Sequence, residues 1–432
     1  MRAIIKRARH LTGELTVPGD KSISHRAVLF GALARGTTRV TGLAPGGDVR
    51  SSAACVAHLG VEMRPAGEGR VEIVSPGRGG WKRGVVHLDA GNSGTTARLM
   101  MGMLAPVEAL TAHLEGDASL SRRPMRRVMQ PLAAMGAQIE LSTAGALPAT
   151  VRGAALHGMK HRLNVSSAQV KTSLLLAGLA AEGKTWVHEP ELSRDHTERL
   201  LPAFGGTLLR GEDGVGVRRH ELTAAELTVP GDPSSAAFFA AAAAIVPGSR
   251  LRIGGVGTNP TRTGIIEVLA AMGAPVEVES GPAAAEPLGT WVCSHHGLSG
   301  TTVAGAIVPR LIDEVPVLAV VAAQASGTTI IRDAGELRVK ESDRLKLVAG
   351  GLAAMGADVE ELPDGLIIRG GRPLHGARID SGMDHRIAMS FAVAGLVADG
   401  ETIIEGAEWA DISFPGFFRL LSEVSGGCVR TE

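Results

Sequence analysis

A short motif recurs along the chain and limits the folds that it can adopt. The sequence LAAMGA occurs three times, and weaker versions of it occur three more times. In each copy, leucine and methionine at helical spacing predict an amphipathic helix, glycine supplies the left-handed residue that ends it, and the alternating residues beyond predict a strand. The six marker glycines, spaced by about 70 residues, are Gly60, Gly136, Gly205, Gly273, Gly356 and Gly426.

A second repeat divides the six units into two halves. The sequence ELTVPGD occurs at Glu14–Asp20 and again at Glu226–Asp232, about half a chain later. Each unit reads as strand, helix, strand, helix and further strands, so we expect an α/β fold with two similar domains of three units each. The chain is expected to cross between the domains near the two copies. One long solenoid is the alternative, but solenoid repeats are shorter and more uniform.

Composition is typical of a reduced, globular protein. Of the 432 residues, 44% are hydrophobic, only 3% are aromatic, and the formal net charge is zero. The neutral balance argues against a nucleic-acid coat or a polybasic membrane surface. The sequence has no long apolar run that would indicate a signal peptide or a membrane span. Cys55, Cys293 and Cys428 form no CxxC pair, which favours a cytoplasmic protein without zinc or disulfides.

The two copies of ELTVPGD continue differently. After the first copy, Asp20 or Ser22 can cap a helix whose first turns carry Lys21, Ser24 and Arg26. Helix amino ends already favour anions, and these cations and hydroxyls strengthen that preference. The second copy is followed by proline, two serines and then small apolar residues, which predicts the same turn without the ligand chemistry. An ordinary capped surface helix remains the alternative for the first copy.

Further segments in the first half combine helix starts with polar or basic side chains. The segment LDAGNSGTTARL predicts a glycine-rich turn that opens a helix, although a single turn of this kind is weak evidence for an anion site. An arginine precedes Pro124 in a predicted loop, and two serines and a glutamine open an apolar helix. The candidate residues are Asn92, Ser93, Gly94, Thr95, Thr96, Arg123, Ser166, Ser167, Gln169, Ser193 and Arg194.

The second half carries the candidate acids. Two acids precede an apolar helix, a lysine and an arginine flank a third acid, and a charged triplet opens another apolar helix. A charged triplet at the start of an apolar helix is more than a solvated surface, so we favour a functional interpretation. In order, these residues are Asp313, Glu314, Lys340, Glu341, Arg344, Asp384, His385 and Arg386.

The balance of these candidates indicates an anionic ligand. Cations outnumber the candidate acids, and arginine suits phosphate and carboxylate groups. The sequence has neither a Walker lysine motif nor GxGxxG, which argues against a nucleotide. His25, His196 and His385 lie in separate motifs without metal-ligand spacing, so we expect no metal site.

Eight motifs together resemble the family of 5-enolpyruvylshikimate-3-phosphate synthases, of the kind often called class II. They occur in order over nearly the whole chain: PGDKSISHRA, GNSGTTARL, GDASLSRRPM, SSAQVK, SRDHTE, IDEVPVLAV, LRVKESDRL and DHRIAMSFAVA. The resemblance implies two domains, each of three βαβαββ repeats in an inside-out α/β barrel-like fold. It places residues 19–230 in one domain and residues 1–18 with 231–432 in the other, with the active site in the cleft between them.

The resemblance also implies a reaction. The family transfers the enolpyruvyl group of phosphoenolpyruvate to the 5-hydroxyl of shikimate-3-phosphate and releases phosphate, without metal or organic cofactor. Both substrates carry a phosphate and a carboxylate, which fits the excess of cations. A cytoplasmic monomer that binds neither nucleic acid nor membrane is expected, with glyphosate as a possible inhibitor.

Site roles follow from the same resemblance. Asp313 resembles the proton acceptor for the 5-hydroxyl and Glu341 the proton donor to the enol carbon, and Lys21 is also assigned to catalysis. Glu341 stands between two cations, which favour its ionised form. The residues expected to bind shikimate-3-phosphate are Lys21, Ser22, Arg26, Ser166, Ser167, Gln169, Arg194, Asp313 and Lys340. Those expected to bind phosphoenolpyruvate are Lys21, Gly94, Arg123, Gln169, Arg344 and Arg386.

Two positions depart from the family pattern, and three other functions compete. Ile412 stands where some relatives have lysine and Glu336 where some have asparagine, so one contact at each substrate is expected to differ. UDP-N-acetylglucosamine enolpyruvyl transferase typically uses a loop cysteine, which EGDASLSRRP lacks. RNA 3′-phosphate cyclase would need a nucleotide-linked histidine, and a catalytically dead binding protein would have lost Asp313 or Glu341. Gly94 leaves room for glyphosate, so we expect sensitivity to it.

Overall fold

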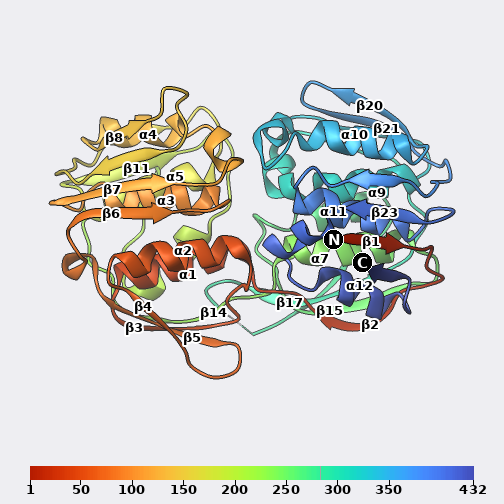
Figure 1. Cartoon of the computed structure of the whole chain (residues 1–432), viewed down its shortest axis with the longest axis horizontal. Helices are drawn as coiled ribbons and strands as arrows, with labels where there is room; N and C mark the ends of the chain where they lie inside the picture. Colours follow the sequence, from red (N-terminus) through yellow and green to blue (C-terminus); the bar gives the residue numbers. More distant parts are fainter. Residues whose placement is uncertain (283) are drawn as a thin grey trace. The chain divides into compact units, whose positions relative to one another are not determined.

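A computed structural model describes residues 1–282 and 284–432, and its chain divides into two compact units. One unit comprises residues 19–229, and the other comprises residues 1–18 and 230–432. Each unit is an α/β body with three four-stranded sheets (Figure 1). Within the described residues, no helix is both long and apolar enough to cross a bilayer.

The unit of residues 19–229 places three of its helices at the centre. α1, α3 and α5 are almost wholly buried, while α2, α4 and α6 each expose part of their surface. The central helices therefore provide the core, and the sheets lie around them. The six helices are α1 (Lys21–Leu33), α2 (Gly47–His58), α3 (Gly94–Leu104), α4 (Arg126–Ala134), α5 (Ala168–Gly178) and α6 (His196–Leu200).

Its three sheets share one topology. In each sheet the first two strands are parallel, and the second and third pairs are antiparallel. In sheet order, the strands are β14 (Glu226–Thr228), β3 (Arg35–Thr41), β5 (Arg70–Pro76) and β4 (Glu62–Pro65); β6 (Gly84–Asp89), β7 (Leu110–Glu115), β9 (Ala149–Arg152) and β8 (Gln138–Leu141); and β10 (Lys160–Arg162), β11 (Lys184–His188), β13 (Gly214–Arg218) and β12 (Leu209–Gly211).

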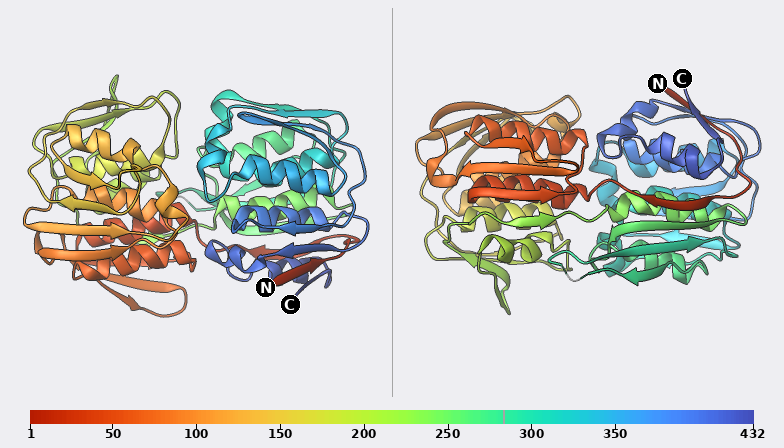
Figure 2. Two further views of the ribbon diagram at one scale, coloured as in Figure 1. Left: turned by 45° about the horizontal axis from the view of Figure 1, so that its top comes forward. Right: turned by 90° about the horizontal axis from the view of Figure 1, so that it is seen from below.

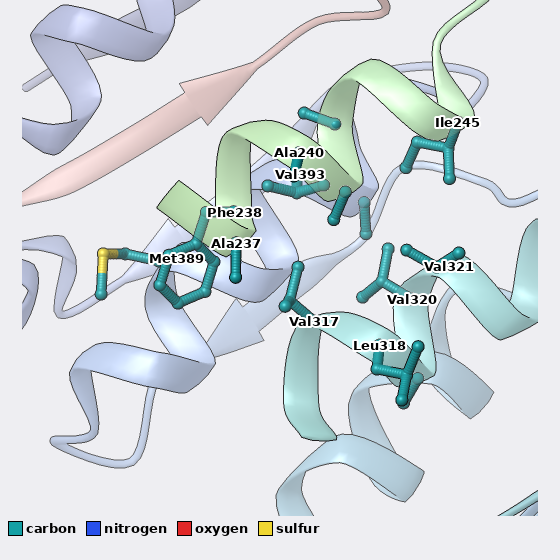
Figure 3. Close-up of a cluster of buried hydrophobic side chains, with 14 of the residues drawn as sticks. Ala237, Phe238, Ala240, Ile245, Val317, Leu318, Val320, Val321, Met389 and Val393 are labelled. Atoms are coloured by element: carbon teal, nitrogen blue, oxygen red, sulfur yellow. The ribbon is translucent and has the colours of Figure 1, made fainter. Parts of the chain in front are cut away.

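The other unit repeats this arrangement. Every residue of α7, α9 and α11 is buried apart from Gln324, and the three helices pack against one another through small and branched side chains (Figure 3). Alanine-rich α7 can approach its neighbours closely because its side chains are short. The helices are α7 (Pro233–Ile245), α8 (Gly264–Ala271), α9 (Val315–Gln324), α10 (Arg344–Ala354), α11 (His385–Gly395) and α12 (Phe417–Val424).

The sheets of this unit have the same order of parallel and antiparallel pairs. The two chain ends lie together because β1 pairs with β24 (Figure 2). In sheet order, the strands are β2 (Thr12–Thr16), β15 (Arg250–Gly257), β17 (Leu288–Ser294) and β16 (Glu277–Ser280); β18 (Thr302–Val303), β19 (Thr328–Ile331), β21 (Gly365–Arg369) and β20 (Asp358–Leu362); and β22 (Arg378–Asp380), β23 (Thr402–Glu405), β1 (Arg2–Ile5) and β24 (Val429–Thr431).

The expected α/β class and six-unit repeat are confirmed. All six marker glycines have positive φ, between 68° and 100°, as a left-handed residue after a helix requires. Three of the six repeats are not formed from one contiguous stretch of the chain. The sheets containing β3 and β15 take their first strand from the other copy of ELTVPGD, and β1 from the chain start completes the last sheet.

The two copies of ELTVPGD thus have the same structural role. Its first residues form a strand, β2 or β14, that stays in one unit, and its aspartate caps the first helix of the other unit. Asp20 accepts a hydrogen bond from the Ile23 N–H and Asp232 accepts one from the Ser234 N–H, each at 2.9 Å. The same seven residues recur because strand, crossing and cap are needed at both places.

Candidate active site

The first group of candidate residues surrounds the start of α1. Lys21 Nζ lies 3.0 Å from Asp48 Oδ2. Arg26 is buried and its guanidinium donates to Thr197 Oγ1 and Thr172 Oγ1, both at 2.8 Å, and to the Ser22 carbonyl at 2.9 Å. These bonds fix the guanidinium against the first turn of α1. The Arg194 Nη1 group donates to Ser22 Oγ at 3.4 Å.

The starts of α3 and α5 are joined by one glutamine. Gln169 donates to Thr95 Oγ1 at 2.9 Å and accepts from Arg98 Nη1 at 2.6 Å. Arg123 donates to Asn92 Oδ1 at 2.8 Å. A Cβ atom on Gly94 would lie 2.8 Å from Arg98 Nη1 and 3.5 Å from Arg123 Nη1. Of the expected phosphoenolpyruvate residues, Arg123 therefore lies beside Gly94 and Gln169 is bonded to the neighbouring Arg98. The missing side chain of Gly94 leaves room for these two guanidinium groups.

A buried ion network holds the segment that carries Ser193 and Arg194. Lys171, which is 1% exposed, lies 2.8 Å from Glu189 Oε2 and 2.7 Å from Glu198 Oε1. Glu189 Oε1 in turn accepts from the Ser167 N–H at 3.0 Å and from Ser193 Oγ at 2.6 Å. One carboxylate thus ties the cap of α5 to the segment before α6.

Backbone bonds complete this attachment. Ser166 Oγ donates to the Glu191 carbonyl at 2.6 Å and accepts from its N–H at 3.0 Å. Ser167 caps α5 by accepting from the Val170 N–H. Ser93 caps α3 in the same manner through the Thr96 N–H. The helix amino ends are therefore ordered by short polar side chains, which leaves each end suited to an anion.

His25 is a buried, uncharged ring. Its Nδ1 lies 2.8 Å from Ser52 Oγ, and Ser52 Oγ is 2.7 Å from Thr96 Oγ1. Burial lowers the pKa of His25 from 6.5 to about 3 because the charged ring would lose its hydration. His196 and His385 are the first residues of α6 and α11. In residues 1–282 and 284–432, no cluster of three or more side chains suited to hold a metal is found.

A pH-dependent loss of stability follows from His25. Because its pKa is lowered in the folded state, the unfolded chain takes up a proton first as the pH falls below 6.5. The contribution of neutral His25 to the free energy of unfolding is complete above pH 6.5, and it declines by up to about 1.4 kcal/mol per pH unit on acidification. Urea unfolding at pH 8 and at pH 5.5 gives the free energy of unfolding at each pH. Its decrease between the two pH values should be about 1 kcal/mol smaller in His25→Gln than in wild type.

A matched variant separates this effect from general acid sensitivity. His58 is exposed on α2, so His58→Gln should lose as much stability between the two pH values as wild type. If His25→Gln behaves like His58→Gln, protonation of His25 does not contribute to the acid sensitivity of the fold.

Three of the candidate acids of the other unit converge on Arg344. Its guanidinium is 2% exposed, and it lies 3.2 Å from Asp313 Oδ1, 2.7 Å from Glu341 Oε2 and 2.8 Å from Asp384 Oδ2. Burial by itself would lower the pKa of Arg344, but the three carboxylates outweigh that effect and raise it. Lys340 Nζ is 3.6 Å from Asp313 Oδ1. Asp313 and Glu341 are thereby held at adjacent nitrogen atoms of one guanidinium.

Arg386 belongs to a second cluster that begins next to the first. It lies 3.7 Å from Glu314 Oε1, and its guanidinium carbon is 5.8 Å from the centre of the Phe238 ring. Ser234 donates to the same Glu314 carboxylate. The second ELTVPGD copy therefore leads into a charged network within the protein.

This network extends to the cap of α7. Arg262, also 2% exposed, donates to Asp232 Oδ1 at 2.9 Å and to Ser234 Oγ at 2.7 Å. The first copy of ELTVPGD is followed by the cations Lys21 and Arg26. The second copy is followed by Ser234, which binds Arg262 from elsewhere in the unit. The apolar residues after Ser234 then form the buried α7.

Several side chains of these networks had no clear signal in the sequence. Lys171 and Arg98 lie inside apolar helical runs, where a charge can be noticed but its partner cannot be identified. Short polar side chains that hold the cations were likewise missed. The residues added by the structure are Asp48, Arg98, Lys171, Thr172, Glu189, Thr197, Glu198, Ser234 and Arg262.

Together, the α/β fold and the two groups of side chains are those of a protein suited to bind phosphate- and carboxylate-bearing molecules. The sequence model of EPSP synthase (3-phosphoshikimate 1-carboxyvinyltransferase) matches residues 5–421. The chain belongs to this family, whose enzymes transfer a carboxyvinyl group to 3-phosphoshikimate, and the resemblance inferred from its motifs is confirmed.

Individual relatives agree with the family match over nearly the full chain. The 3-phosphoshikimate 1-carboxyvinyltransferase of Pelotomaculum thermopropionicum is 51% identical over 97% of this chain and 98% of its own length. The enzyme of the same name from Brevibacillus brevis is 49% identical over 98% and 99%. A solved structure of EPSP synthase from Acinetobacter baumannii is similar, with a TM-score of 0.87 and 42% identity over 100% of this chain and 99% of that one.

Proposed function

We propose that the two groups of side chains act together on one pair of substrates in the reaction of the family. The enzyme transfers the enolpyruvyl group of phosphoenolpyruvate to the 5-hydroxyl of shikimate-3-phosphate and releases phosphate, a step of aromatic amino-acid biosynthesis. In this proposal residues 19–229 supply most of the anion-binding groups, and the second unit supplies the acids.

The chemistry can be written with the residues at Arg344. Asp313 takes the proton of the 5-hydroxyl as its oxygen attacks carbon 2 of phosphoenolpyruvate, and Glu341, acting from its protonated form, gives a proton to carbon 3. Glu341 then takes a proton back from carbon 3 while the carbon–oxygen bond to phosphate breaks, which restores the double bond and releases phosphate. Asp313 passes its proton to solvent. The observation that supports these roles is that Arg344 holds both carboxylates at bonding distance, 3.2 and 2.7 Å.

Binding roles are proposed for the remaining residues on charge and position. Around α1, Lys21, Ser22, Arg26 and Arg194 are assigned to shikimate-3-phosphate with Lys340 of the other unit; Ser166, Ser167 and Gln169 join them at α5. The residues assigned to phosphoenolpyruvate are Gly94, Arg123, Arg344 and Arg386, and Lys21 and Gln169 are assigned to it as well. Guanidinium groups pair with both phosphate and carboxylate, so this set suits two doubly functional anions.

One assay tests the proposal as a whole. Phosphate release from phosphoenolpyruvate should require shikimate-3-phosphate and should proceed without added metal or organic cofactor. Release in its absence, or release with UDP-N-acetylglucosamine instead, would show that the acceptor is wrong. Release with UDP-N-acetylglucosamine is not expected, because the transferase for that acceptor typically uses a reactive cysteine. Cys55 is buried on α2, and burial raises the pKa of its thiol to about 12, far from that of a reactive thiolate.

Glu189 is expected to determine affinity for shikimate-3-phosphate. Glu189→Ala removes the acceptor of the Ser167 N–H and Ser193 Oγ, and also one of the two carboxylates at Lys171, so the segment beside Arg194 loses its anchor. We expect the KM for shikimate-3-phosphate to rise by about tenfold and the KM for phosphoenolpyruvate to change less. Glu191→Ala is the control, because Glu191 contributes only backbone groups to this contact. Equal rises in both KM values would indicate a general structural effect.

Glyphosate is proposed to inhibit in competition with phosphoenolpyruvate. In Gly94→Ala, the added methyl group would displace the Arg98 guanidinium and reduce the space at Arg123. We expect the glyphosate inhibition constant to rise much more than the KM for phosphoenolpyruvate, since the inhibitor is the longer molecule. Gly350→Ala on α10 should leave both constants unchanged, because a Cβ there meets no atom within 4 Å. Equal changes in the two constants for Gly94→Ala would contradict discrimination by length.

A monomer in the cytoplasm completes the proposal. All three cysteines are free thiols, which suits a reducing compartment. Light scattering should give the mass of one chain, and the mass of a dimer would contradict this.

A further inference from the structure

A cavity in the unit of residues 19–229 lies outside the proposed substrate residues. Its volume is about 450 Å³, which is within the size range of small-molecule sites. Its walls come from the ends of α1 and α5, the turn after β5 and the segment before β14. The charged and polar lining side chains are Arg35, Arg78, His220 and Glu221, and the larger apolar ones are Leu33, Pro76, Leu179 and Leu222.

Arg78 is a half-buried cation whose charge is poorly balanced. Its Nη2 group donates to the Leu179 carbonyl at 3.1 Å, which occupies one of the five guanidinium N–H groups. Burial lowers the pKa of Arg78 to about 10, and the carboxylate of Glu221 only partly opposes this effect. Arg219 and Arg83 lower the pKa further. An additional negative charge would therefore be favourable beside Arg78.

Two other lining side chains leave polar groups available. Across residues 1–282 and 284–432, the side chains of Arg35 and His220 make no hydrogen bond or ion pair with another residue. The Arg35 backbone pairs with Leu222 and Ala224, which fixes the base of its side chain at the cavity. Counting Arg35, Arg78 and Glu221, the lining carries one net positive charge, which matches a monoanion.

We propose that this cavity binds a small organic monoanion, a carboxylate attached to an apolar body. Arg78 and Arg35 hold the carboxylate, because guanidinium N–H groups match its two oxygen atoms. Leu33, Leu179 and Leu222 contact the apolar part. None of these residues belongs to the two groups of substrate residues, so the ligand need not be a substrate of the transferase reaction.

Methyl NMR on leucine-labelled protein tests the proposal with benzoate as the probe. The methyl signals of Leu33, Leu179 and Leu222 should shift in a saturable manner, with a dissociation constant of about 1 mM or tighter. Benzamide, the uncharged analogue, and inorganic phosphate, which lacks the apolar part, should bind at least several-fold more weakly. Unmoved signals, or equal affinity for either comparison compound, would overturn the proposed ligand class.

Three variants assign the effect to the cavity. Arg78→Gln should weaken benzoate binding on the order of tenfold, the loss of one charge-assisted bond. Arg35→Gln should weaken it several-fold, and the exposed position of Arg35 makes this change safe for folding. Arg83→Gln removes a charge nearby but outside the lining, and should change affinity by no more than about twofold. Equal losses in all three variants would indicate a general surface field and overturn the proposed site.

Discussion

Replacing Arg344 with methionine is expected to lower the free energy of unfolding by about 3–5 kcal/mol and to abolish turnover. The guanidinium is 2% exposed and faces three carboxylates, of which Asp384 is fully buried. Without the cation, these carboxylates lose the guanidinium that they share in a poorly solvated place, and Lys340, 3.6 Å from Asp313 Oδ1, is a more distant cation. Urea unfolding monitored by circular dichroism, together with the phosphate-release assay, measures both effects.

Two comparison variants sharpen this result. Arg344→Lys keeps the charge, but its ammonium group cannot bond three carboxylates at once as the planar guanidinium does. Compared with Arg344→Met, it should recover part of the stability and little of the activity. Arg369 pairs with Asp358 and Glu360 on the surface, and Arg369→Met should cost no more than about 1 kcal/mol. If Arg344→Met costs as little as Arg369→Met, Arg344 does not organise the acids in the way described.

Asp313→Asn and Glu341→Gln are each expected to lower kcat by about two orders of magnitude or more. Both changes keep the size of the side chain and a bonding oxygen for Arg344, but remove the group that exchanges a proton. KM values should change little, because neither side chain supplies the positive charge that binds the substrates. Steady-state kinetics with both substrates varied gives kcat and KM separately.

The control for these variants is an acid that pairs with arginine elsewhere. Glu361 bonds Arg338 at 2.8 Å on β20, and Glu361→Gln should keep wild-type kinetics. Near-normal turnover in Asp313→Asn or Glu341→Gln would show that the role assigned to that residue is wrong.

Local features of the fold were predictable because their causes are local. A glycine after an amphipathic helix needs only its own backbone to adopt positive φ, and all six marker glycines do so. Ser93, Ser167 and Asp384 cap the helices that their sequences predicted, since the capping partner lies two or three residues away. The same reasoning placed Asp313 directly before α9 and Glu341 beside Arg344.

Partners that are distant in sequence could not be predicted in this way. Lys171 lies in an apolar helical run, and only the folded unit shows that Glu189 and Glu198 neutralise it. The crossing of the chain near the two ELTVPGD copies was expected, but the pairing of β14 with β3 and of β2 with β15 was not, because these strand partners are distant in sequence. The pairing of β1 with β23 and β24 joins the two ends of the chain, which no repeat pattern indicates.

The proton that Glu341 is proposed to give to carbon 3 offers the most direct test of the account. When the reaction runs in heavy water, carbon 3 becomes a methyl group with one deuterium before a proton is lost. The vinyl group of the product should therefore carry deuterium in a large part of the molecules, as measured by mass spectrometry. In Glu341→Gln, both product and incorporated deuterium should appear at least about a hundredfold more slowly. Product formed at the normal rate without deuterium in its vinyl group would contradict the proposed mechanism.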